Sequence, residues 1–125
     1  MQIEVKGRNL PITDELREVV TRRFEKVSKQ VSELAVLEVE LFEERNPANP
    51  DSQVAEATLH LKGVTLRAHE ASRDLKHSIN LISDELARQV KRHRDKRRKR
   101  REQRAAAAAP PAVVEEGPGE AAPAW

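Results

Sequence analysis

Hydrophobic and polar residues alternate in four short stretches of the chain, and this two-residue period is typical of β-strands. It predicts strands over residues 2–6, 35–43, 53–62 and 64–70. The last two are separated by Lys62 and Gly63, which suit a two-residue hairpin turn. The turn predicts three apolar cross-strand pairs on one sheet face, namely Leu61 with Val64, Leu59 with Leu66, and Ala57 with Ala68.

Two further stretches show the three- and four-residue spacing of amphipathic helices. The first spans about residues 14–31 and follows Thr13, a favourable N-cap residue. Its apolar stripe consists of Leu16, Val19, Val20, Phe24, Val27 and Val31. The second is capped by Ser72 and Asp74, and its stripe consists of Leu75, Ile79, Ile82, Leu86 and Val90.

The second helical stripe stops at Val90, where arginines take over the angular positions of the apolar residues. Arg97, Arg100 and Arg104 occupy these positions. A helix that is basic on all sides does not dock on an apolar core, so we expect residues 91–104 to project from the domain. Five alanines at 105–109 favour a continued helix until Pro110 and Pro111 stop it.

The order β-α-β-β-β-α predicts an α+β domain with a four-stranded sheet and two helices packed on one of its faces. We expect this domain to cover residues 1–94. A basic helical extension over 95–104 would follow it. The remaining residues, 105–125, are rich in Ala, Pro and Glu and are predicted to be a disordered tail.

Composition excludes several classes of function. Aromatic residues make up 2% of the chain, so a nucleic-acid site built on stacked rings is excluded. There is no Cys, which excludes a disulfide scaffold, a zinc knuckle and a thiol nucleophile. No apolar stretch is long enough to span a bilayer or to act as a signal peptide. We therefore expect a cytoplasmic protein without a membrane partner.

Charge is distributed unevenly along the chain, although the net charge is only +2. Residues 91–104 carry 10 Lys and Arg against 2 Asp and Glu. Residues 1–90 and 105–125 are each net acidic. A local excess of this size destabilises an isolated helix by self-repulsion, which predicts a polyanionic partner.

Candidate catalytic and metal-binding groups do not assemble in the predicted fold. In the hairpin register His69 lies opposite Glu56, four residues from His60, or roughly 13 Å at the rise of a strand. The other two histidines, His77 and His93, lie among charged neighbours. No nucleophile elbow, phosphate-binding loop or metal-ligand spacing is present. We expect no enzymatic activity, cofactor, metal or small-molecule substrate.

Cationic residues follow one flank of each predicted helix. They are Arg22, Arg23, Lys26 and Lys29 on the first helix, and Arg88, Arg92, Lys96 and Lys99 on the second. The acidic residues Glu18, Glu25 and Asp84 are expected elsewhere on these helices. Two basic flanks in one helical layer would form a groove for a phosphate backbone.

Three segments resemble the bacterial ribosome hibernation promoting factors, which include protein Y. Residues 16–26 look like the first helix of that family, and residues 57–61 are similar to its third strand. Asp74-Leu75, Ile79 and the run Leu86-Ala87-Arg88-Gln89-Val90 resemble its second helix. The resemblance extends over about residues 1–100.

The resemblance implies a fold like a double-stranded RNA-binding domain and a ribosomal partner. It implies binding to small-subunit rRNA in the channel shared by mRNA and the A- and P-site tRNAs, which stabilises inactive ribosomes under stress or in stationary phase. By position, rRNA contacts fall on Arg23, Lys26, Arg88, Arg92 and Lys96, with Gln89 in the matched run. The predicted RNA-binding set is Arg22, Arg23, Lys26, Arg88, Gln89, Lys91, Arg92, Arg94 and Lys96.

The chain departs from the family pattern at two positions. Glu85 stands where the family usually has Lys, and Lys76 stands where an aromatic residue usually follows Asp74-Leu75. Because no second apolar pattern follows residue 104, the chain resembles a short form with an acidic tail like that of protein Y, and we expect a monomer when it is free. The alternatives are a general structured-RNA binder or RNA chaperone, and a DNA-compacting protein.

Overall fold

The computed structural model describes residues 1–108, which fall into a first unit, residues 1–92, and a second unit that begins at His93. Seven elements are formed, namely β1 (Gln2–Arg8), α1 (Asp14–Arg23), α2 (Glu25–Ser28), β2 (Val36–Glu43), β3 (Gln53–Leu61), β4 (Val64–Ser72) and α3 (Leu75–Ala108).

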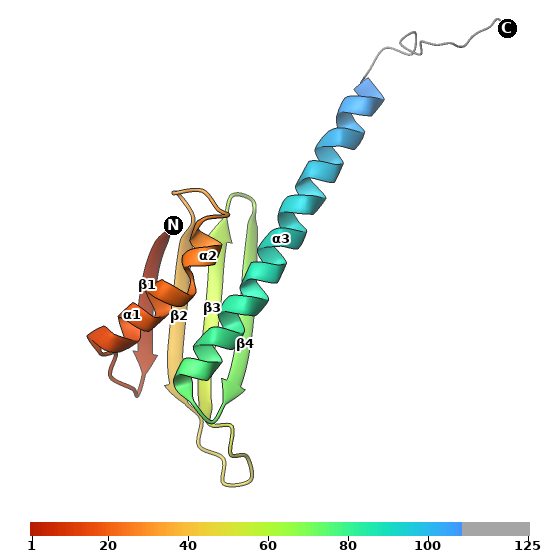
Figure 1. Cartoon of the computed structure of the whole chain (residues 1–125). Coiled ribbons are helices and arrows are strands. Elements are labelled where there is room, and N and C mark those ends of the chain that lie inside the picture. The colour runs from red at the N-terminus through yellow and green to blue at the C-terminus, as the bar shows by residue number, and fades with distance from the viewer. Residues whose placement is uncertain (109–125) are drawn as a thin grey trace, which may run out of the picture. The chain divides into compact units, whose positions relative to one another are not determined.

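The four strands form one open sheet in the order β1-β2-β3-β4 (Figure 1). β1 pairs with β2 in parallel, and the other two pairs are antiparallel. The predicted hairpin register is confirmed, because Leu61 pairs with Val64 and Leu59 with Leu66. Gly63 has a φ of 80°, a left-handed conformation that favours glycine and closes the two-residue turn.

The helices of the first unit cover one face of the sheet (Figure 1), as the sequence predicts. Their stripes and the alternate residues of β2, β3 and β4 make one core that is almost wholly aliphatic. Among the described residues, Phe24 is the one aromatic ring of this cluster and is fully buried, while Phe42 is buried outside the cluster. Its buried members are Val20, Phe24, Val27, Ala35, Leu37, Val39, Leu41, Ala55, Ala57, Leu59, Ala68, Ile79, Ile82, Leu86 and Val90.

The prediction of one continuous helix over residues 14–31 is wrong. Thr13 caps α1 as expected, accepting the Leu16 N–H at 3.2 Å, but α1 ends at Arg23 and α2 spans only Glu25–Ser28. Phe24 lies between them with φ −91° and ψ 5°. Its carbonyl accepts the N–H groups of both Val27 and Ser28, which tightens the backbone. The break keeps Phe24 and Val27 buried together and involves neither proline nor glycine, so side-chain spacing does not reveal it.

A polar network fixes the start of α3 against the sheet. The Asp74 carboxylate accepts the Lys76 N–H at 3.3 Å, which confirms Asp74 as a capping residue. The buried Ser78 hydroxyl donates to the Gln53 carbonyl of β3 at 2.7 Å and contacts the Ser72 hydroxyl at 2.7 Å. These contacts satisfy the buried hydroxyls and set the position of the first turn on the sheet.

The long helix α3 continues through the basic run as far as Ala108, so the first alanines of the predicted tail are helical. The rest of that tail, residues 109–125, lies outside the described residues. Within residues 1–108, no helix is both long and apolar enough to cross a membrane.

Phe24 offers a direct test of the core. Replacing Phe24 with Ala should lower the free energy of unfolding by about 3–5 kcal/mol, because no other ring is available to fill the cavity. Urea unfolding followed by circular dichroism measures this loss. Leu34 is 89% exposed and serves as the control, since Leu34→Ala should change stability by less than about 0.5 kcal/mol. Equal losses for the two variants would contradict the described packing.

Candidate nucleic-acid interface

The basic residues of α1 and α2 surround one open pocket on the helical face of the first unit. Arg22 and Arg23 come from the last turn of α1, and Lys26 comes from α2. All three are exposed, and the pocket also contains Lys29, Glu25, Gln30 and, from α3, Asn80. The structure therefore brings together the three residues of the first helix that the sequence selects.

An ion pair links this pocket to α3. The Lys26 ammonium contacts the Asp84 carboxylate, and both side chains are a little under half exposed. The prediction that Asp84 and Glu25 lie away from the basic flank is wrong for both residues. Asp84 binds Lys26, and Glu25 lines the pocket. The residues are 58 positions apart, so only the packing of α2 against α3 brings them together.

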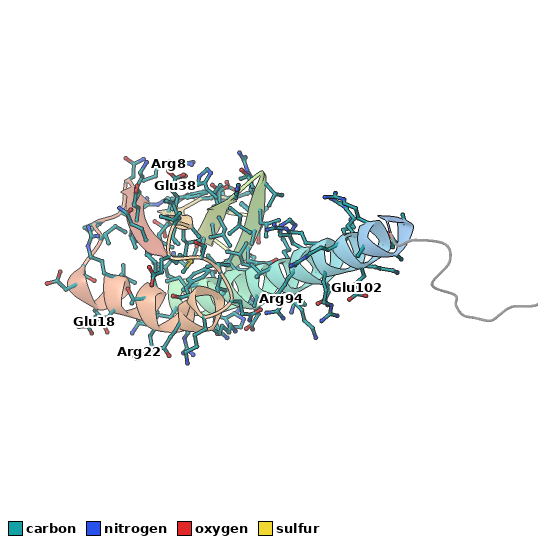
Figure 2. The ribbon with its side chains drawn as sticks, turned by 90° about the horizontal axis from the view of Figure 1, so that it is seen from above. Arg8, Glu18, Arg22, Glu38, Arg94 and Glu102 are labelled. Atoms are coloured by element: carbon teal, nitrogen blue, oxygen red, sulfur yellow. The ribbon has the colours of Figure 1, made fainter. Side chains whose placement is uncertain are left out.

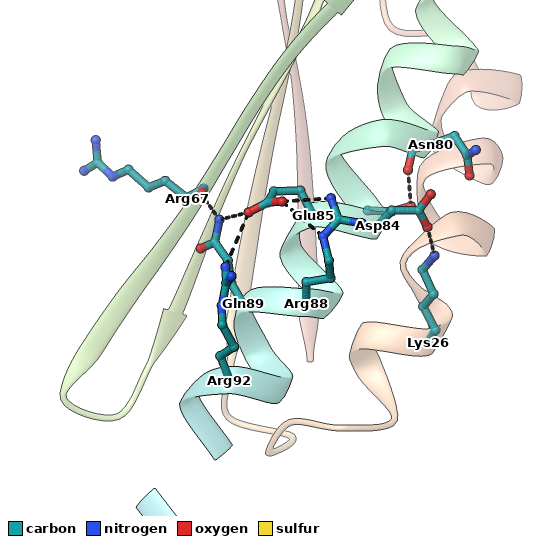
Figure 3. A network of polar contacts seen from close by, with 9 residues as sticks. Lys26, Arg67, Asn80, Asp84, Glu85, Arg88, Gln89 and Arg92 are labelled. Atoms are coloured by element: carbon teal, nitrogen blue, oxygen red, sulfur yellow. Dashed lines mark hydrogen bonds and ion pairs between the residues drawn. The ribbon is translucent and has the colours of Figure 1, made fainter. Parts of the chain in front are cut away.

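A second polar network centres on Glu85 of α3 (Figure 3). Arg88 donates to the Glu85 carboxylate at 2.8 Å and 3.3 Å through two nitrogens. The Gln89 amide donates to it at 3.0 Å, and the Arg92 guanidinium lies 3.7 Å away. Hydrogen bonds from Gln89 and Arg88, with the charges of Arg88 and Arg92, hold the pKa of Glu85 below its usual value.

Gln89 has a structural role that its place in the sequence does not reveal. Its amide donates to the main-chain carbonyl of Arg67 in the edge strand β4 at 2.7 Å, as well as to Glu85 (Figure 3). Both amide protons are therefore used within the fold. The spacing of Glu85, Arg88 and Gln89 at three and four residues indicates the contacts along the helix, but nothing local indicates the contact with β4.

The remaining predicted residues lie at or beyond the boundary between the two units. Lys91 is exposed in the last turn of the first unit. Arg94 and Lys96 belong to the second unit, where both are exposed on the helix. The nine predicted residues thus comprise one pocket on α1 and α2, one network around Glu85 and three separate exposed cations.

The opposite face of the sheet carries two of the four histidines, His60 and His69. Figure 2 shows Arg8 and Glu38 on this side and Arg22 on the helical side. His60 contacts Glu38 at 3.3 Å, and His69 contacts Glu56 at 3.4 Å in the predicted register. Arg8 binds Glu40 at 2.6 Å and stacks on the Phe42 ring at 4.1 Å. In the described part of the chain, no three His, Asp or Glu side chains are placed to hold a metal ion.

Comparison with known proteins identifies the family. Residues 3–98 match the model of the family described as sigma 54 modulation protein / S30EA ribosomal protein. This chain belongs to that family. Named members among its relatives are ribosome hibernation promoting factors, as the resemblance implied. All nine predicted RNA-binding residues lie within the range that matches the S30EA family.

Relatives in the family differ in length. The ribosome hibernation promoting factor of Salmonella typhimurium is 34% identical over 96 residues, which cover 77% of this chain and 96% of that protein. The ribosome hibernation promotion factor of Picosynechococcus is 32% identical over 97 residues, which cover 77% of this chain. This chain spans 50% of the length of the Picosynechococcus protein.

Two solved structures have the same fold. The N-terminal domain of Thermus thermophilus protein Y is 30% identical, with a TM-score of 0.64 over 74% of this chain and 99% of that domain. A ribosomal subunit interface protein from Coxiella burnetii is similar with a TM-score of 0.63 over 76% of this chain and 99% of that protein. At 19% identity, the Coxiella protein supports the fold alone. The α+β assignment is confirmed.

The Glu85 network predicts a measurable titration. Replacing Arg88 with Ala should raise the pKa of Glu85 toward the usual glutamate value, because two hydrogen bonds and a nearby positive charge are lost. NMR titration of the Glu85 side-chain carboxyl carbon measures the shift. The native contacts contribute to stability at neutral pH, and this contribution is lost as the pH falls through the lowered pKa.

Arg92 provides a graded control for this titration. It contacts Glu85 only at 3.7 Å and donates no hydrogen bond to it, so Arg92→Ala should shift the pKa of Glu85 less than Arg88→Ala does. An unchanged titration in the Arg88→Ala protein would show that the network does not form in solution.

Proposed function

We propose that this protein is a ribosome hibernation factor that binds rRNA of the small ribosomal subunit in the mRNA and tRNA channel, near the A and P sites. In this position it excludes mRNA and tRNA and keeps the ribosome inactive, and it acts in the cytoplasm without catalysing a reaction. Membership of the S30EA family supports the ribosomal partner. The observation that carries the proposal is the group of cations on one helical layer, drawn from segments more than fifty residues apart.

The proposed binding is an exchange of ions. Each rRNA phosphate that meets Arg22, Arg23, Lys26, Arg88 or Arg92 releases condensed counterions, so affinity depends steeply on salt. Lys26, Arg88 and Arg92 already contact carboxylates in the free protein. A phosphate that binds these cations competes with Asp84 or Glu85 for their charge and for some of their N–H donors. Exposed ion pairs of this kind are worth at most about 1 kcal/mol each, so the exchange is readily reversible.

Sedimentation of a stationary-phase lysate separates this proposal from a general RNA binder or chaperone. A hibernation factor co-migrates with intact ribosomes or small subunits, whereas a general RNA binder distributes over free RNA. Translation in a reconstituted system supplies the second measurement. Inhibition at stoichiometric amounts of protein supports occupation of the channel, and inhibition only at large excess supports non-specific binding.

Arg88 and Arg92 test the α3 part of this surface. Replacing both with Glu should weaken binding to small subunits at least tenfold at moderate salt, because two phosphate contacts become repulsive. Both residues are exposed, so the fold should persist. The matched control is Lys6→Glu with Arg67→Glu, which makes the same charge change on the opposite sheet face. Equal losses in both double variants would mean that net charge alone controls binding.

Glu85 should weaken RNA binding in the native protein. Replacing Glu85 with Gln frees Arg88 and Arg92 from an ion pair and removes a charge that repels phosphate, so affinity for small subunits should rise several-fold at low salt. Filter binding over a salt series measures this rise, which should shrink as salt increases. The control Glu18→Gln removes the same charge from α1, and an equal gain there would refute a specific role for Glu85.

A further inference from the structure

The second unit carries a pocket lined only by arginines. Arg97, Arg100, Arg101 and Arg104 line it. At 100° per residue, these positions fall within about 100° of arc on the helix. The first and last of them are about 10 Å apart along the helix axis. We call this surface the arginine face.

The two carboxylates among the described residues of this unit, Asp95 and Glu102, contact another arginine. Asp95 contacts Arg98 at 3.9 Å, and Glu102 contacts Arg98 at 3.8 Å. On the helical wheel both carboxylates lie on the side opposite the arginine face. Within residues 1–108, none of the four arginines of the face forms an ion pair or a side-chain hydrogen bond. The face is therefore a concentrated positive charge without a described counterion on the protein.

The arginine face contains arginine and no lysine. The second unit contains Lys96 and Lys99, but neither lines the pocket. A guanidinium presents a planar fork that binds two oxygens of one phosphate, whereas an ammonium acts as a point charge. Four clustered guanidinium groups repel one another in the free protein, and bound phosphate removes that repulsion. Both features favour phosphate groups as the ligand.

We propose that Arg97, Arg100, Arg101 and Arg104 form a second RNA-binding site, which binds consecutive phosphates of one strand of structured RNA. This rests on the proposed function and extends it beyond the surface of residues 1–92. An axial span of about 10 Å is long enough for the four arginines to reach more than one phosphate of the same strand. The family match ends at residue 98, so three of the four arginines lie outside it.

Two quadruple variants of the full chain test the site. In one, Arg97, Arg100, Arg101 and Arg104 are all replaced with Gln, and in the other all four are replaced with Lys. Arg, Lys and Gln have similar helix propensities, so circular dichroism should show unchanged helix content. The single substitution Arg98→Lys is the matched control, because Arg98 lies off the arginine face and contacts both carboxylates.

Affinity is measured for purified small subunits and for a short RNA duplex over a range of salt concentrations. The Gln variant should bind both at least tenfold more weakly at 0.1 M salt, and its salt slope on the duplex should fall by about two to three. The Lys variant keeps every charge but should still bind about three- to tenfold more weakly, because the bidentate contacts are lost. Arg98→Lys should bind like the native protein.

The outcomes separate this proposal from the proposed function. In one outcome, the native protein and both quadruple variants bind small subunits equally well, and the Arg88→Glu/Arg92→Glu protein does not bind. That result refutes the proposed RNA site on the arginine face and supports the ribosomal function. Lys-variant binding equal to native also overturns the site, since charge alone then suffices. If native protein binds the duplex through the arginine face but does not bind small subunits, the ribosomal function fails instead.

A further experiment tests whether the arginine face binds the phosphates of RNA or those of a lipid surface. Vesicles containing phosphatidylglycerol present phosphates at a lipid surface in place of RNA. The native protein should bind the RNA duplex in preference to these vesicles at the same salt concentration. Tighter binding to vesicles that depends on the arginine face would overturn the assignment to RNA.

Discussion

The packing of two apolar helical stripes against one face of a four-stranded sheet is the contact on which the rest of the first unit depends. With a single aromatic ring in the core, stability rests on many aliphatic contacts, and each stripe must face the sheet to make them. This requirement fixes the rotation of α1, α2 and the first part of α3 about their axes. The flanks of those stripes, where the cations lie, are fixed with them.

This packing brings Lys26 to Asp84, whereas Arg88 and Arg92 reach Glu85 along α3 itself. Several cations of the proposed RNA surface therefore already contact carboxylates. These pairs are exposed and add little to stability. In the proposed RNA complex, each phosphate competes with a carboxylate for these cations, and we expect this competition to favour RNA that presents several phosphates at once. A protein of modest net charge can thus hold a basic surface without binding every polyanion equally.

The two units differ in how their cations are placed relative to carboxylates. In the first unit, Lys26 and Arg88 contact the carboxylates of Asp84 and Glu85. Both carboxylates belong to α3, and the apolar stripe of α3 is buried in the core. In the second unit there is no buried core among the described residues, and helix periodicity alone sorts the charges. It places Asp95 and Glu102 beside Arg98 and leaves four other arginines together. Arginine suits such a surface because its charge and its fork geometry do not depend on surrounding structure.

Much of this protein follows from the sequence by itself. The two-residue and three-to-four-residue periods determine the strands, the hairpin register and the apolar face, since each is a local property of side-chain spacing. The charge run and the family resemblance are likewise readable there. Only the tertiary structure decided the break at Phe24, the Lys26–Asp84 pair and the bond from Gln89 to the Arg67 carbonyl. At the break the Phe24 carbonyl accepts two N–H groups, and neither proline nor glycine marks it. The two contacts join segments 58 and 22 positions apart, so no local pattern encodes them.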